Sequence, residues 1–73
     1  MTITCKAREF KCEHEAYHYA IQRGGDVLSM PGGRYLVVSA RDVERIDRAG
    51  GPETARFIGR RERGGYRTIA VGS

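Results

Sequence analysis

The segment that decides the fold reads VLSMPGGRYLVVSARDVERIDRAGG and occupies residues 27–51. Two short runs rich in β-branched, aromatic and leucine residues, 26–30 and 34–39, flank Pro31-Gly32-Gly33. That arrangement is typical of a β-hairpin. The second run contains the sequence YLVV, and we expect it to be the central strand of a sheet.

A helix is expected directly after this hairpin, over residues 40–49. The Ser39 hydroxyl can accept a hydrogen bond from the backbone N–H of Asp42, which is the usual chemistry of a helix N-cap. Val43 and Ile46 supply an apolar stripe, and the run Gly50-Gly51-Pro52 ends the helix.

Doubled glycines divide the rest of the chain in the same way. They account for eight of the ten glycines and stand at Gly24-Gly25, Gly32-Gly33, Gly50-Gly51 and Gly64-Gly65. Glycine adopts positive φ without a steric penalty, so such pairs are typical of helix ends and tight turns.

Three further elements follow from this division. Residues 9–23 predict a helix whose apolar stripe is Phe10, Tyr17 and Ile21. Residues 55–61 and 66–71 predict a second hairpin, with Gly64-Gly65 as a two-residue primed turn. Residues 2–7 alternate weakly and allow an extra N-terminal strand.

The expected fold is therefore a small α+β domain with the element order α-ββ-α-ββ. About four strands in two hairpins form a mostly antiparallel sheet, and two helices cover one face of it. We expect residues 1–73 to be a single domain with a thin core, because a chain of this length buries a modest share of its surface.

Composition excludes several classes of protein. A content of 40% hydrophobic and 30% charged residues indicates a globular chain. No apolar run approaches the roughly 20 residues that span a bilayer, and the N-terminus lacks a secretory signal pattern, so we expect a cytoplasmic protein with no membrane partner. Cys5 and Cys12 are too few for a disulfide framework and are expected to be free thiols.

The sequence HEAYH, residues 14–18, has the spacing of the zinc-peptidase signature HExxH. In the expected helix, however, His14 lies among Phe10, Tyr17 and Ile21 and would be packed in the core. A catalytic zinc also needs a third protein ligand, and the chain has only two histidines. The sequence therefore predicts a packed histidine and neither a bound metal nor a cofactor.

A structural zinc site built from Cys5, Cys12, His14 and His18 is the alternative metal hypothesis. The residue types are suitable, but their spacing matches no common zinc finger. Within one helix Cys12 and His14 would also point in different directions.

The positive charge is concentrated near the C-terminus. Residues 1–55 hold eight basic and eight acidic residues, whereas residues 56–73 hold five arginines and one glutamate, which accounts for the net charge of +4. A two-residue turn would place Ile58 opposite Val71 and let Glu62 pair with Arg67. The candidate nucleic-acid-binding residues of this hairpin are Arg60, Arg61, Arg63, Tyr66 and Arg67.

No arrangement of residues indicates catalysis, so the sequence predicts a non-enzymatic binding or interaction module. Its partner would be a protein or a second copy of the chain, since a small sheet leaves edges to cover. Four tyrosines provide the kind of contact area that interfaces favour: Tyr17, Tyr19, Tyr35 and Tyr66. Weak nucleic-acid binding through the C-terminal hairpin is the alternative, followed by zinc binding through the first helix.

Overall fold

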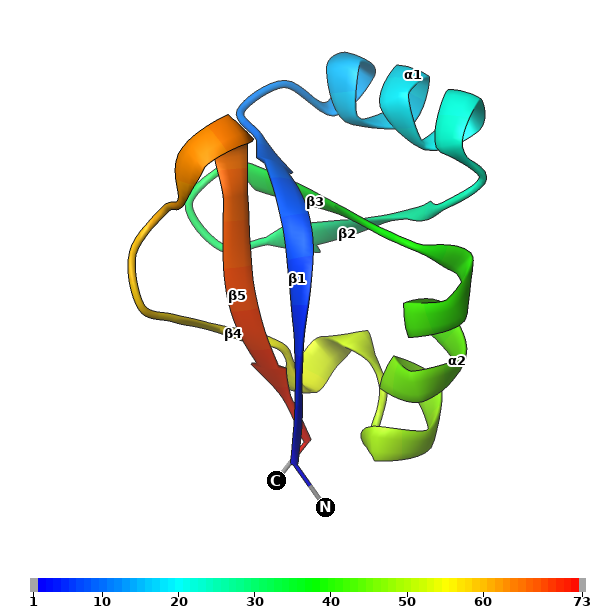
Figure 1. Ribbon diagram of the computed structural model, residues 1–73, viewed down its shortest axis with the longest axis vertical. Helices are drawn as coiled ribbons and strands as arrows, with labels where there is room; N and C mark the ends of the chain where they lie inside the picture. Colours follow the sequence, from blue (N-terminus) through cyan, green and yellow to red (C-terminus); the bar gives the residue numbers. More distant parts are fainter. Residues whose placement is uncertain (1, 73) are drawn as a thin grey trace.

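The computed structural model describes residues 2–72, which form one five-stranded sheet and two α-helices (Figure 1). The strands are β1 (Ile3–Phe10), β2 (Asp26–Met30), β3 (Arg34–Val38), β4 (Arg56–Ile58) and β5 (Tyr66–Val71). The helices are α1 (Glu13–Arg23) and α2 (Ala40–Ala49). Two short 3-10 turns lie at Pro52–Thr54 and Arg63–Gly65.

The sheet has the strand order β2-β3-β1-β5-β4, and every neighbouring pair is antiparallel. The predicted α+β class is confirmed, and so are the antiparallel sheet and its two hairpins, β2–β3 and β4–β5. The N-terminal strand that the sequence allowed is present as β1.

The prediction that the YLVV segment forms the central strand is wrong, because β1 takes that position. β1 pairs with β3 through residues 8–10 and with β5 through residues 3–8. Its alternate residues Lys6 and Arg8 are polar because they belong to the outer face of the sheet. β1 therefore contains no continuous apolar run, which is the pattern that indicated YLVV as the central strand.

Helix α1 begins four residues later than expected. Phe10 belongs to β1, where it is paired with Tyr35, and Cys12 occupies the N-cap. The helix ends as predicted at Gly24, whose φ of 74° lies in the left-handed region and whose N–H donates to the Ala20 carbonyl at 2.8 Å.

Helix α2 matches the predicted bounds and cap. The Ser39 Oγ accepts a hydrogen bond from the Asp42 N–H at 3.2 Å, and the helix ends at Gly50. Ile46 is fully enclosed in the core, and Val43 is partly buried against it.

The two helices lie against opposite faces of the sheet, so the expectation that they share one face differs from the structure. Ile46 of α2 packs with Leu36 and Val38, whereas Ala16 and Ala20 of α1 pack with Val37. Adjacent residues of a strand point to opposite faces, and β3 is apolar on both. Figure 1 shows α1 beside one end of the sheet and α2 beside the other.

The expected apolar stripe of α1 is not its buried face. Tyr17 is 51% exposed and Ile21 is 81% exposed, while the small residues Ala16 and Ala20 contact the sheet. These two alanines lie one residue before Tyr17 and Ile21, which corresponds to a rotation of about 100° around the helix. His14 is consequently exposed, and the prediction that it is packed in the core is wrong.

The second hairpin has a different register from the predicted one. Ile58 is paired with Thr68, three residues along β5 from the expected partner Val71. A shift by an odd number reverses the faces, so Phe57 packs against the core and Ile58 is 37% exposed. The predicted two-residue turn is replaced by a loop over residues 59–65, in which Gly64 and Gly65 have φ of 76° and 81°.

We predict that Ile46→Ala lowers the free energy of unfolding by about 2–4 kcal/mol, because it opens a cavity where α2 meets the sheet. Urea denaturation measures this loss. Glu44→Ala, an exposed site on the same helix, is the control and should change the free energy by less than about 0.5 kcal/mol. Equal stability of the two variants would show that α2 does not pack on the sheet.

Candidate anion-binding site

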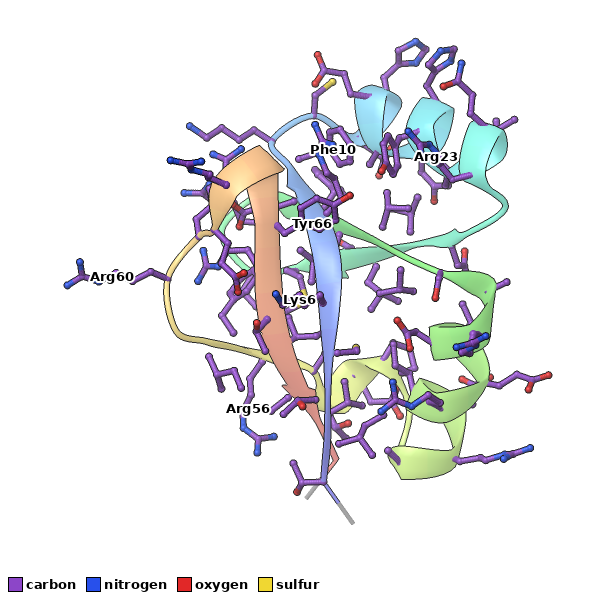
Figure 2. The ribbon with its side chains drawn as sticks, viewed as in Figure 1. Lys6, Phe10, Arg23, Arg56, Arg60 and Tyr66 are labelled. Atoms are coloured by element: carbon purple, nitrogen blue, oxygen red, sulfur yellow. The ribbon has the colours of Figure 1, made fainter. Side chains whose placement is uncertain are left out.

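Basic and aromatic side chains gather on the outer face of β1 and β5, next to α1. Lys6 is paired across the strands with Thr68, and Arg8 with Tyr66, so these four residues share one face. In Figure 2, Lys6 and Tyr66 lie over β1 and β5, while Phe10 and Arg23 lie nearer to α1.

Arg8 lies among three aromatic rings. The guanidinium carbon is 5.6 Å from the ring centroid of Phe10, 5.3 Å from that of Tyr19 and 5.6 Å from that of Tyr66. Arg23 adds a second cation 5.1 Å from the Tyr19 centroid. Cation–π contacts of this kind fix the orientation of a guanidinium while leaving its N–H donors available to a ligand.

A groove of about 310 Å³ opens beside this cluster. Its lining includes three cations, Lys6, Arg8 and Arg23, together with the rings of Tyr19 and Tyr66 and an apolar floor at Val37 and Val38. No carboxylate lines the groove among the described residues. The nearest ion pair at its edge is Lys6 Nζ to Glu62 Oε1, at 3.0 Å, and both side chains are largely exposed.

A second cleft of about 420 Å³ adjoins the first, since Arg8 lines both. Its positive groups are Arg8, Lys11 and Arg61, and the backbone of Gly64 and Gly65 forms part of its wall. Glu9 and Glu15 also line it, so its charge is less uniform than that of the groove. The two clefts together form one open, mainly basic surface centred on Arg8.

Three groups of the groove act on the phenol oxygen of Tyr66. A hydrogen bond from the Tyr19 side chain, a hydrogen bond from Arg8 and the charges of Arg8 and Arg23 lower the pKa of the Tyr66 phenol. The same donors and charges would act on a phosphate or carboxylate oxygen in this position.

The inner face holds a buried carboxylate, Glu9, whose side chain is 2% exposed. Three arginines surround it. The distance from a guanidinium nitrogen to a Glu9 carboxylate oxygen is 3.3 Å for Arg67, 3.7 Å for Arg61 and 3.8 Å for Arg34. Arg67 also lies over the Phe57 ring, at 4.1 Å from its centroid. Burial of an unpaired carboxylate is costly, so Glu9 holds these arginines, and its ion pair with Arg61 keeps the loop 59–65 against β1.

The structure separates the four arginines and one tyrosine proposed from the C-terminal sequence. Tyr66 lines the groove and Arg61 lines the adjoining cleft, whereas Arg67 points to the inner face and pairs with Glu9. The expected pairing of Glu62 with Arg67 is wrong, because Glu62 pairs with Lys6 and Thr68. Arg60 and Arg63 are exposed in the loop, and Figure 2 shows Arg60 extending away from the body of the protein.

Four residues of the groove were not assigned to a site from the sequence, although Tyr19 was named as a contact tyrosine: Lys6, Arg8, Tyr19 and Arg23. The alternation of residues 2–7 could have indicated two of them. If the predicted strand is continued to Arg8, Lys6 and Arg8 lie on one face. Tyr19 and Arg23 are one turn apart on α1, but nothing in the sequence places that helix beside β1.

The four residues of the proposed zinc sites do not converge. Cys5 is buried, whereas Cys12, His14 and His18 are exposed, and no group of three or more potential metal ligands occurs within residues 2–72. Burial raises the pKa of the Cys5 thiol and disfavours the thiolate that would bind a metal. His18 lies 3.3 Å from the Gln22 side chain.

Comparison of the chain with protein families, with curated proteins and with solved structures gives no match. In the described part of the chain no helix has both the length and the apolar character needed to cross a bilayer.

We predict that Tyr66 ionises at a lower pH than an ordinary tyrosine, because Tyr19, Arg8 and Arg23 stabilise its phenolate. Alkaline titration of tyrosinate absorbance measures this, and Tyr66→Phe should remove the phenol that ionises first. Tyr17→Phe removes an exposed phenol and should leave that first step in place. An unchanged first step in Tyr66→Phe would show that the groove does not stabilise a negative oxygen.

Proposed function

We propose that this domain is a non-enzymatic binding module for nucleic acid, and that it binds on the outer face of β1 and β5 beside α1. The observation that carries the proposal is the position of Arg8, which lies among three aromatic rings where two basic clefts meet. Arginine beside aromatic rings is suited to hold a phosphate while a base stacks nearby.

The extent of the basic surface favours a polyanion over a single phosphate. Lys6 and Arg23 line one cleft, Lys11 and Arg61 line the other, and Arg8 lines both. A chain of phosphates could contact several of these cations at once, and each such contact releases counterions and adds affinity.

The net charge supports weak, salt-sensitive binding. The full chain carries +4, and the exposed Arg60 and Arg63 extend the positive potential along the loop 59–65. The proposed site therefore includes Tyr66 and Arg61 of the predicted C-terminal hairpin, but its centre is Arg8. Arg61 and Arg67 both pair with Glu9, but the Arg61 side chain is 51% exposed and lines a cleft, whereas that of Arg67 is 19% exposed and is left out of the contact surface.

Three further parts of the proposal concern catalysis, cellular location and protein partners. The ionisable groups that line the groove are three cations and two tyrosines, and Arg8 and Arg23 make cation–π contacts there. This composition suits binding more than acid–base chemistry. A cytoplasmic location stays a prediction from the sequence. A protein partner or self-association stays a prediction, which the exposed Tyr17 and Ile21 of α1 favour.

We predict that Arg8→Ala weakens nucleic-acid binding about tenfold at low salt, since it removes a phosphate contact and the support of two tyrosine rings. The slope of log K against log salt should also become shallower by about 0.7. Fluorescence anisotropy with a labelled oligonucleotide at several salt concentrations measures both quantities.

Arg48→Ala is the matched control, because it removes the same charge from an exposed position of α2, on the other side of the sheet. It should weaken binding by less than about twofold. Absence of salt-dependent binding to any nucleic acid would contradict the proposed function. Equal losses in the two variants would contradict the proposed site.

A further inference from the structure

We infer that the nucleic acid bound here is single-stranded, with its backbone following the two clefts that meet at Arg8 and a base stacked beside Tyr66. This inference rests on the proposed function and specifies its ligand. Three features support it: the concave shape of the basic surface, the lack of a projecting hairpin or basic helix in the described residues, and the surroundings of the Tyr66 ring.

The basic surface is concave. Both clefts have volumes in the range of pockets that hold small groups, about 300–1,000 Å³, at 310 Å³ and 420 Å³. The bases of a duplex are stacked and paired inside it, so they cannot enter such clefts. An unpaired strand can turn its bases outward and insert them.

The element that would read a duplex groove is missing from the described residues. The major groove admits a helix or a two-stranded ribbon. The second hairpin could have supplied a ribbon, but its strand β4 has three residues and its loop folds back onto β1. The ion pairs Lys6–Glu62 and Arg61–Glu9 hold the loop there.

Neither helix offers a basic face in its place. The exposed residues of α1 include two carboxylates, Glu13 and Glu15, and one arginine, Arg23, which lines the groove itself. Exposed residues of α2 alternate in sign, as in the pair of Arg45 with Asp42 at 2.9 Å. The cluster of cations around Arg8 therefore lies on a concave part of the protein, and the exposed cations beside it are Arg60 and Arg63 of the loop 59–65.

The ring of Tyr66 is placed to receive a base. It is 38% exposed and stands at the start of β5, between the groove and the cleft lined by Gly64 and Gly65. A Cβ atom at Gly64 would lie 3.3 Å from Cδ2 and Cε2 of the Tyr66 ring, so glycine leaves this edge of the ring uncovered. Arg8 lies against the ring and supplies the adjoining positive charge.

The test compares three ligands at one low salt concentration: a labelled oligothymidine of about ten nucleotides, a duplex of matched length, and poly-glutamate. We expect the single strand to bind at least about tenfold more tightly than either of the others, because base stacking adds to phosphate contact.

The variant Tyr66→Leu removes the ring and keeps an apolar side chain. It should weaken binding of the single strand about tenfold and change duplex binding by less than about twofold. Tyr66→Phe keeps the ring and should keep most of the affinity, which separates stacking from a loss of folding. Tyr17→Leu, at an exposed site on α1, is the matched control and should bind as the parent does.

The outcomes separate the inference from the function on which it rests. Equal or tighter binding of the duplex overturns the single-strand inference and leaves nucleic-acid binding intact. If poly-glutamate binds as tightly as the oligonucleotide, base stacking does not contribute to affinity, and the single-strand inference is overturned. Binding of no nucleic acid at low salt contradicts the proposed function itself.

Discussion

The alternation of side chains along β1 is the constraint on which the rest of the structure depends. β1 is the central strand, and its residues point in turn to the inner face, with Cys5, Ala7 and Glu9, and to the outer face. β3 and β5 take their register from it, and α2 and α1 pack on its two sides. A slip of one residue would exchange the faces, exposing the core residues and burying Lys6 and Arg8.

The same alternation separates charges that are adjacent in the sequence. Glu9 points inward and gathers Arg34, Arg61 and Arg67, while its neighbour Arg8 points outward and meets aromatic rings. The ion pairs of the Glu9 carboxylate within the described residues therefore involve these three arginines and not Arg8. Both faces of this end of β1 become positive, and the outer one is open to solvent.

The sequence predicted the elements that depend on local chemistry. Capping by Ser39, the end of α1 at Gly24 and the hairpin at Pro31-Gly32-Gly33 each need only a few neighbouring residues. The predicted register of the second hairpin was wrong because Gly64 and Gly65, although both have positive φ, belong to the longer loop over residues 59–65 and do not form a two-residue turn. The centrality of β1 depends on long-range pairing and could not be seen locally.

The candidate site was predictable only in part for the same reason. Tyr66 and Arg61 stand in a conspicuous basic segment, whereas Arg8 and Tyr19 become neighbours only when α1 turns back over β1. The apolar stripe of α1 also misled, because Ala16 and Ala20 are small enough to approach the sheet and the larger Tyr17 and Ile21 are left outside. The larger apolar residues of α1 therefore did not mark the face of the helix that is buried.

The most direct test of the central role of β1 is native-state hydrogen exchange followed by NMR. We predict that the hydrogen-bonded amides of β1 exchange through global unfolding, with the same free energy as those of β5, while amides of the edge strand β4 exchange faster. Fast exchange along β1 through local opening, with β3 and β5 still protected, would contradict it.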